Sequence, residues 1–315
     1  IANMGKKSSI KYVMKHLRII LMSMVAAFLV SCGTTKTVPI TGRTQNLMVS
    51  DDQVLSLSFQ EYSDYMKTAK ASSNSTNTAM VKRVGQNIAK AVESYLTQNG
   101  MAEDVKTYSW EFNLVQDNQV NAWCMPGGKI VVYEGLLPVT QDEASLAIVM
   151  GHEIAHAVAR HSVERLSNAY KEQYGAAALS ALLQGAGVSS GWQQLASLAH
   201  QYGGALFTSG FSRKQESEAD HIGLIFAAMA GYNPEVAVTF WQRMSSATGG
   251  GSNSLFADHP SDATRIQQIQ GWLPEAKKYY KPVTTTTKNT STKKKTTTKK
   301  KIEIGRAVQQ ECRDR

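Results

Sequence analysis

Cysteine is scarce in this chain: three of its 315 residues are cysteines. They are Cys32, Cys124 and Cys312, and they lie far apart in the sequence. Disulfide-dense scaffolds need several paired cysteines, so this class of protein is excluded. Hydrophobic residues make up 42% of the chain, which is enough for a sizeable core. We expect Cys124 to lie in that core as a small apolar residue.

The chain also lacks a hydrophobic run long enough to cross a bilayer. An apolar-rich run from Ile19 to Val30 has twelve residues, whereas a membrane-spanning helix needs about 20. A basic stretch precedes this run, as in secretory signal peptides. The segment Leu29-Val30-Ser31-Cys32 at its end resembles the bacterial lipobox. This resemblance implies a signal peptide over residues 1–31 and lipidation of Cys32; the alternative is an ordinary secretory signal with an incidental cysteine.

Acidic residues are few at both ends of the chain, which explains the formal net charge of +9. Between residues 33 and 283 there are 19 Lys and Arg and 22 Asp and Glu, so the body is slightly negative. Nucleic-acid binding loses its main support, and we expect no nucleic-acid partner. The Thr/Lys-rich residues 283–302 cannot form a core and are predicted to be disordered. Residues 303–315 resemble a translated sequencing adapter, and we interpret them as a non-native tail.

Sequence periodicity predicts an α+β domain over residues 51–282 that is mainly helical and has a small sheet. An extended lead-in over residues 32–50 precedes this domain. Ser50 and Gln53 form a capping-box pattern at the start of the first helix. The predicted helices cover residues 51–69, 80–96, 140–166, 211–232, a segment that begins at Pro234, and 261–280, and the predicted strands lie within 108–117 and 126–137.

The sequence "VMGHEIAHAVARH" (149–161) places His152, Glu153 and His156 in a run that otherwise indicates a buried apolar helix. Histidines four residues apart lie on one helix face, so two neutral imidazoles can bind one Zn²⁺. The metal offsets the cost of polar groups in an apolar helix, lowers the pKa of a water molecule and polarises a scissile carbonyl. Glu153 points toward that water and can act as its general base. His161 is rotated off this face, and we expect it at the surface.

A catalytic zinc site needs a third protein ligand. Metzincins would have glycine and histidine at two later positions, where this chain has Ala159 and Ser162, so that class is excluded. The remaining candidates are Glu216, Glu218 and Asp220 in "RKQESEAD". Glu216 and Asp220 share a helix face, whereas Glu218 points elsewhere and is expected to face solvent.

Four segments together resemble a known family: "NAWCMPGGKIVVYEGLL", "GHEIAHAVARH", "FSRKQESEAD" and "DHPSDATRI". In this order they resemble the motifs of the HtpX-like and CAAX-prenyl-protease-type zinc metalloendopeptidases, which are gluzincins, and more narrowly their soluble, signal-bearing bacterial branch. The resemblance covers roughly residues 37–280. It implies a gluzincin domain with a small mixed β-sheet packed beside the HExxH helix. It also implies one Zn²⁺ per subunit, with His152, His156 and Glu216 as ligands and Glu153 as the general base.

The same resemblance implies roles for three further residues. Asp220 matches the acidic residue one turn after the third ligand, and it is expected to orient a ligand imidazole by accepting its other N–H. The alternative for Asp220 is a solvated helix charge. His259 and Arg265 match catalytic residues that can donate hydrogen bonds to the oxyanion of the transition state. His259 could instead be an extra zinc ligand or a turn residue before Pro260.

In the family, the strand that follows residue 121 lies at the edge of the cleft, where an extended peptide can add to the sheet by β-augmentation. Asn121, Gly127 and Gly128 are predicted to orient this edge, and a purely structural turn role remains open. The segment from Gln173 to Ser212 contains no Asp, Glu, Lys or Arg. We interpret it as a helical hairpin packed on the body, with a mobile lid near the cleft as the alternative.

These predictions describe a zinc metalloendopeptidase of the bacterial cell envelope, a lipid-anchored outer-membrane lipoprotein that faces the periplasm. Its expected substrates are misfolded or unassembled envelope polypeptides, an inference that depends on the family resemblance alone. The alternative is a chaperone-like or binding lipoprotein in which the metal site is of secondary importance.

Overall fold

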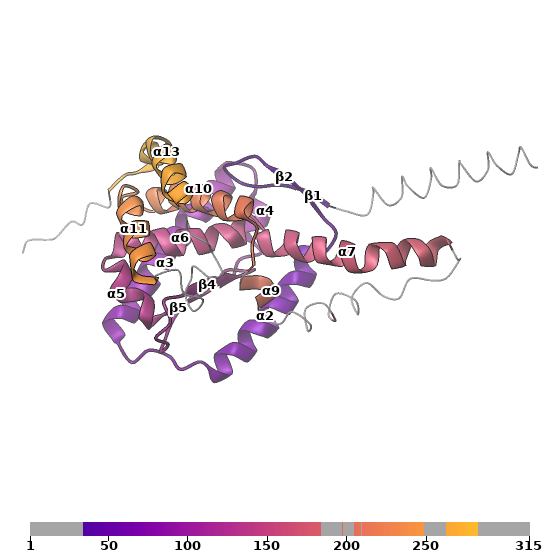
Figure 1. Cartoon of the computed structure of the whole chain (residues 1–315), viewed down its shortest axis with the longest axis horizontal. Coiled ribbons are helices and arrows are strands. Elements are labelled where there is room, and N and C mark those ends of the chain that lie inside the picture. The colour runs from indigo at the N-terminus through magenta and orange to yellow at the C-terminus, as the bar shows by residue number, and fades with distance from the viewer. Residues whose placement is uncertain (1–33, 184–196, 198–204, 209, 249–262, 283–315) are drawn as a thin grey trace, which may run out of the picture. The chain divides into compact units, whose positions relative to one another are not determined.

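The computed structural model describes residues 34–183, 197, 205–208, 210–248 and 263–282 (Figure 1). These residues belong to one compact unit that ends at Pro282. They form a mainly helical fold with a small mixed sheet, which confirms the predicted fold class. The predictions for the signal peptide, Cys32, His259 and the two tail segments lie outside the described residues.

Three groups of elements follow one another along the described chain. The first comprises the strands β1 (Thr34–Thr37) and β2 (Thr44–Leu47) and the helices α2 (Asp51–Thr68), α3 (Ser75–Gln98) and α4 (Ala102–Val105). The second comprises the strands β3 (Glu111–Val115), β4 (Ala122–Met125) and β5 (Lys129–Tyr133) and the short helices η1 (Glu134–Leu136) and α5 (Leu137–Thr140). The third comprises α6 (Glu143–Val158), α7 (His161–Leu183), α9 (Ala205–Thr208), α10 (Arg213–Met229), α11 (Val236–Thr248) and α13 (Ala263–Tyr279). Among these described helices, none is both long and apolar enough to cross a membrane.

The larger sheet has the strand order β3-β5-β4. β3 runs parallel to β5, and β4 runs antiparallel to it with Cys124 opposite Ile130. Cys124 is buried in the core, as predicted. Gly127 and Gly128 form the turn between β4 and β5 at φ values of 86° and 82°, which glycine adopts without strain. A Cβ atom on Gly127 would lie 2.5 Å from the ring of Phe59, which would have to move to make room for it.

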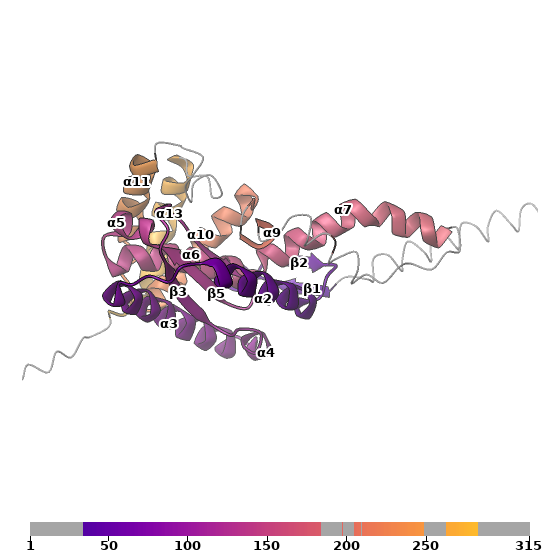
Figure 2. The ribbon, with the colours of Figure 1, turned by 90° about the horizontal axis from the view of Figure 1, so that it is seen from below.

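Helix α6 lies at the centre of the fold. Every residue from Ser145 to Val158 is buried, and α3, α10 and β4 pack around the helix (Figure 1, Figure 2). α10 crosses α6 where Gly223 meets Gly151. A Cβ atom on Gly223 would lie 2.6 Å from the carbonyl carbon of Gly151. The backbones of the two helices are therefore in direct contact at this crossing.

The prediction of one helix over residues 140–166 is wrong, because the helix is interrupted. α6 ends at Val158, Arg160 adopts a left-handed φ of 54°, and α7 begins at His161. The buried side chain of Arg160 pairs with Asp104 at 2.7 Å and with Asp51 at 3.4 Å. These tertiary ion pairs stabilise a backbone conformation that is costly for a residue with a side chain. α7 begins with His161, whose Nδ1 lies 2.9 Å from Nδ1 of His156 on α6.

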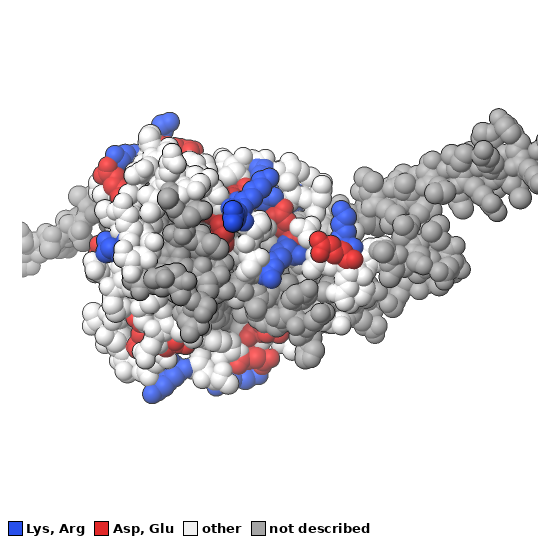
Figure 3. All heavy atoms as spheres, viewed as in Figure 1, with Lys and Arg blue, Asp and Glu red and all other residues white. Residues whose placement is uncertain are grey.

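Charged side chains of both signs are interspersed on the face drawn in Figure 3. Several are paired in the structure, for example Lys67 with Asp64 at 2.6 Å and Lys106 with Glu103 at 2.7 Å. This pattern agrees with the near balance of charge between residues 33 and 283.

Candidate metal centre

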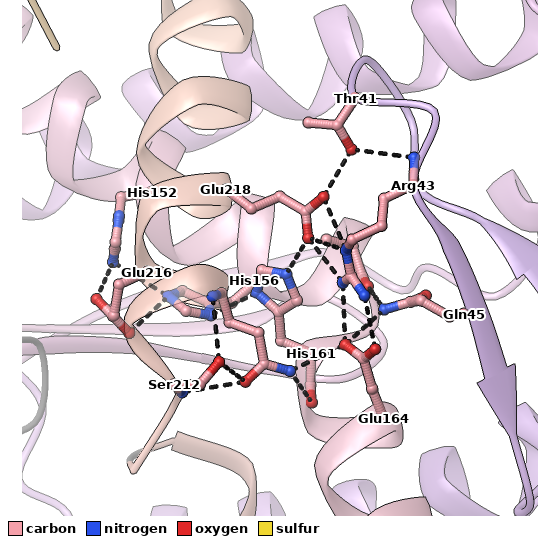
Figure 4. Close-up of polar contacts among 12 residues, drawn as sticks. Thr41, Arg43, Gln45, His152, His156, His161, Glu164, Ser212, Glu216 and Glu218 are labelled. Carbon is pink, nitrogen blue, oxygen red and sulfur yellow. Dashed lines mark hydrogen bonds and ion pairs between the residues drawn. The ribbon is translucent and has the colours of Figure 1, made fainter. Parts of the chain in front are cut away.

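Helices α6 and α10 carry the side chains of the candidate metal centre. α6 begins after Asp142, whose carboxylate accepts a hydrogen bond from the Ser145 N–H at 2.7 Å. α10 begins after Ser212, which forms a capping box with Gln215. These caps satisfy backbone N–H groups and fix the residue at which each helix starts. Glu216 consequently lies in the first turn of α10 and reaches toward α6 (Figure 4).

The side chains of His152, His156 and Glu216 converge on one point. The two Nε2 atoms of the histidines lie 3.1 Å apart, and the Glu216 carboxylate oxygens lie 3.5 Å from Nε2 of His152 and 3.4 Å from Nε2 of His156. Ligands at Zn–N distances of 2.0–2.1 Å in a tetrahedron are separated by about 3.3–3.4 Å. The three ligand atoms therefore fit a zinc ion. All three residues are buried, and together they form a group that can hold a metal ion within the described part of the chain.

Asp220 lies one turn after Glu216 and contacts the opposite nitrogen of His152. Its Oδ1 is 2.8 Å from Nδ1 of His152 and accepts a hydrogen bond from Nη2 of Arg265 at 2.6 Å. The guanidinium of Arg265 lies 3.5 Å from the centre of the Trp241 ring. Burial acts to lower the pKa of His152, but Asp220 and Glu216 raise it to about 9.

His156 contacts a second histidine on the side away from Glu216. Nδ1 of His156 lies 2.9 Å from Nδ1 of His161, and Nε2 of His161 lies 3.1 Å from Oε2 of Glu218. His161 is fully buried and Glu218 is 8% exposed, so the predictions that His161 is at the surface and that Glu218 faces solvent are both wrong. The break between α6 and α7 returns His161 to the site, and the β1–β2 hairpin covers Glu218 (Figure 4). Burial lowers the pKa of His161.

The loop of the β1–β2 hairpin supplies the partners of Glu218. Thr41 donates a hydrogen bond to Oε1 of Glu218 at 2.6 Å, and Nε of Arg43 donates to Oε2 at 2.8 Å. Nη1 of Arg43 also donates to Oε1 of Glu164 on α7 at 2.6 Å. Burial acts to raise the pKa of Glu218, but hydrogen bonds from His161, Arg43 and Thr41 lower it to about 2. The lead-in, which was predicted only as an extended segment, thus packs against the metal centre.

Glu164 makes this attachment of the hairpin sensitive to acid. Burial acts to raise its pKa, but hydrogen bonds from Arg43, Gln45 and Gln215 lower it below the ordinary value of 4.5. A carboxyl with a lowered pKa stabilises the fold above its ordinary pKa and loses this contribution as the pH falls toward the folded value. E164Q is expected to reduce the free energy of unfolding by about 1–3 kcal/mol at neutral pH.

The same variant is expected to lose less stability than the wild type between neutral pH and about pH 3, because it lacks this titrating group. Urea unfolding at several pH values measures both effects. E103Q is the matched control, since Glu103 pairs with Lys106 on the surface and its side chain is 83% exposed. Equal acid sensitivity of E164Q and the wild type would contradict the prediction.

Glu153 and the predicted peptide-binding edge lie on the side of α6 that faces β4. Glu153 is 2% exposed, and burial together with its charge raises the pKa of the Cys124 thiol on β4. The side-chain oxygen of Asn121 accepts a hydrogen bond from the Ala122 N–H at 2.8 Å. Gly127 and Gly128 form the following turn, which gives them a structural role. The role of these residues in binding a peptide stays a prediction.

A cavity of 260 Å³ lies beside the metal centre. Its lining includes Glu216, Asp220, Arg265 and Phe211. The ring of Phe211 stacks on His156 with 4.1 Å between ring centres. Arg265 is 5% exposed and donates to Asp220, whose Oδ1 lies 2.8 Å from Nδ1 of His152. The contact of Arg265 with an oxyanion stays a prediction.

The structure combines a mainly helical fold and a small mixed sheet with a His–His–Glu group on two crossing helices. This combination is that of a metallopeptidase domain of the gluzincin class. Residues 76–273 match the model of peptidase family M48, and the chain belongs to this family.

Several relatives are named as metalloproteases. Metalloprotease LoiP of Escherichia coli is 31% identical over 227 residues, which cover 72% of this chain and 82% of the relative. Metalloprotease YcaL of the same organism is 30% identical over 192 residues, which cover 60% of this chain and 69% of the relative. Mitochondrial metalloendopeptidase OMA1 of Schizosaccharomyces pombe is 38% identical over 194 residues, which cover 60% of this chain and 53% of the relative. The chain thus spans about half the length of this OMA1 relative.

Proposed function

We propose that this protein is a zinc-dependent metalloendopeptidase that hydrolyses peptide bonds in polypeptides. The observation that carries the proposal is the convergence of His152, His156 and Glu216, whose ligand atoms lie 3.1–3.5 Å apart. Membership of family M48 and the printed names of the relatives support the same activity.

The residues of the metal centre would have three different roles in the reaction. His152, His156 and Glu216 would hold the zinc ion, which when bound polarises the scissile carbonyl and lowers the pKa of water. Glu153 would accept a proton from the attacking water and return it to the leaving nitrogen. Asp220 would hold the proton on Nδ1 of His152 and so leave Nε2 available to the metal.

His259 and Arg265 are proposed to assist the reaction in different ways. His259 would donate a hydrogen bond to the oxyanion of the transition state, as the family resemblance implies. Arg265 would act through Asp220, to which its Nη2 donates at 2.6 Å, and we retain oxyanion binding as its second proposed role. The strand β4, with Asn121 before it and Gly127 and Gly128 after it, would bind the substrate backbone.

We also propose that the protein is an outer-membrane lipoprotein that faces the periplasm and is anchored through Cys32. The lipobox-like segment before Cys32 and the similarity to two Escherichia coli proteins support this location. The soluble, signal-bearing branch of the HtpX-like family remains the proposed subgroup, and misfolded or unassembled envelope proteins remain the proposed substrates. Labelling of Cys32 with a radioactive fatty acid in cells tests the anchor, and a C32A variant that is labelled equally would contradict it.

Removal of zinc tests the proposed activity. The purified protein is expected to contain one zinc ion per chain and to degrade casein; removal of the metal with a chelator is expected to abolish cleavage, and one equivalent of zinc is expected to restore it. Metal analysis by mass spectrometry and release of fluorescent casein fragments measure the two quantities. Circular dichroism is the control that tests whether the protein stays folded after the metal is removed. Casein binding without cleavage by the zinc-loaded protein would instead favour the chaperone-like alternative.

A further inference from the structure

A continuous series of hydrogen bonds, buried as far as Glu218, leads from His156 to the β1–β2 hairpin. Nδ1 of His156 lies 2.9 Å from Nδ1 of His161, and Nε2 of His161 lies 3.1 Å from Oε2 of Glu218. The carboxylate of Glu218 then accepts hydrogen bonds from Thr41 and Arg43. His156 is 1% exposed and His161 is fully buried, so water does not compete for these contacts.

The donor and acceptor capacities of the two imidazoles and the carboxylate allow one arrangement of protons in this series when a metal ion is bound to His156. For Nε2 of His156 to bind a metal, its Nδ1 must carry the proton. Nδ1 of His161 must then accept that hydrogen bond, which places the proton of His161 on Nε2. This N–H points at Glu218, and a carboxylate can only accept. The reverse tautomer of His161 would place two N–H groups opposite each other at Nδ1 and a lone pair opposite the carboxylate.

We propose that His161 and Glu218, held by Thr41 and Arg43, are positioning residues that fix the tautomer and ring orientation of His156 for zinc binding. This inference rests on the proposed function, since it assumes that His156 is a zinc ligand. His161 and Glu218 do for His156 what Asp220 does for His152, so each imidazole ligand is oriented from its own side. The chain segment that precedes the family match is consequently part of the metal centre.

The hairpin is required because Glu218 is a buried charge. Its carboxylate is offset by the guanidinium of Arg43, whose Nη2 lies 2.7 Å from Oε2 of Glu218. Removal of one partner from a buried pair leaves an uncompensated charge. Glu218 would then relax toward solvent and release His161, and His156 would lose the acceptor that holds its proton on Nδ1.

Two nearly isosteric substitutions of His161 in the full chain test the inference. Asparagine places an amide oxygen near the position of Nδ1 and can still accept from His156. Glutamine places its amide near Nε2 and can contact Glu218, but it leaves no acceptor for His156. Loss of such a contact typically weakens metal binding about 10–100-fold. We therefore expect zinc to dissociate from H161Q into a colorimetric chelator about 10–100-fold faster than from the wild type. H161N keeps the acceptor for His156 but loses the contact with Glu218, so its rate is expected to lie between those of H161Q and the wild type.

The catalytic parameters provide the second readout. H161Q is expected to lower kcat for a peptide substrate at limiting zinc while KM is unchanged, because the fully buried His161 is not available to the substrate.

R43A is expected to release zinc faster than the wild type, as H161Q is. R83A is its matched control, since Arg83 pairs with Glu143 on the surface. H221F is the control for loss of a histidine, since His221 on α10 pairs with Glu275 at 2.7 Å and stacks on Trp272.

The possible results distinguish failure of this inference from failure of the proposed function. Equal zinc dissociation from H161N, H161Q and H221F, with wild-type zinc content and casein cleavage, would overturn the inference and leave the proposed function standing. A wild-type protein that holds no zinc would overturn both. If H161Q does not fold, the comparison of R43A with R83A decides, and equal zinc dissociation from these two variants overturns the inference.

Discussion

Replacement of Glu153 by glutamine is expected to lower kcat for casein cleavage about 10²–10⁴-fold. Glutamine keeps the size of the buried side chain, but it cannot take a proton from water. The three converging ligand atoms belong to other residues, so the zinc content of E153Q should remain one ion per chain. Steady-state cleavage of a fluorescent casein and metal analysis on the same sample measure the two expectations.

E143Q is the control for this prediction. Glu143 lies in the first turn of the same helix and pairs with Arg83 at the surface, so its loss should leave casein cleavage unchanged. Full activity of E153Q with normal zinc would exclude Glu153 as the general base. If E153Q is inactive, comparison of envelope proteins by mass spectrometry in cells that carry wild type or E153Q identifies the substrates as the proteins that accumulate.

Replacement of Gly223 by alanine is expected to separate the two helices that carry the proposed metal ligands. The added Cβ would lie 2.6 Å from the carbonyl carbon of Gly151 and 2.6 Å from the backbone nitrogen of His152. Backbone atoms of a buried helix cannot move away as a flexible side chain can. Overpacking of this kind costs about 1–3 kcal/mol. Because His152 lies on one helix and Glu216 on the other, the same shift should increase the rate of zinc dissociation.

Urea unfolding and the zinc dissociation rate of G223A measure these two effects. G271A is the matched control, because Gly271 lies in helix α13 and a Cβ there would meet no atom within 4 Å. Alanine at such a position favours the helix by about 0.5–1 kcal/mol. The two glycine-to-alanine changes are therefore expected to alter stability in opposite directions. A G223A protein as stable as the wild type would show that the helices can separate at no cost.

The parts of the metal centre that depend on local spacing could be predicted from the sequence. Helical spacing placed His152 and His156 on one face, and it grouped Glu216 with Asp220 on another helix. Local spacing left the choice among the acidic residues of α10 open, and the family resemblance selected Glu216. The capping residue Ser50 was predicted for the same reason, since its partner Gln53 is three residues away.

The parts that depend on distant contacts could not be predicted. The break after α6 contains no glycine or proline, and it is stabilised by ion pairs of Arg160 with Asp51 and Asp104. A continuous helix would have directed His161 to solvent, which explains the wrong prediction. Glu218 does point away from the ligand face of α10, but the hairpin occupies that side. No periodicity in residues 32–50 relates Arg43 to a carboxylate on a distant helix.

The burial of helix α6 has a consequence for any map of mutational tolerance. Its residues from Ser145 to Val158 are all buried, so substitutions of apolar and motif positions should both abolish function in a growth selection. A selection of this kind would show the helix as one uniform block in which the motif is invisible. Only a screen that scores abundance and hydrolysis separately would distinguish Ile154, where abundance falls, from Glu153, where turnover falls.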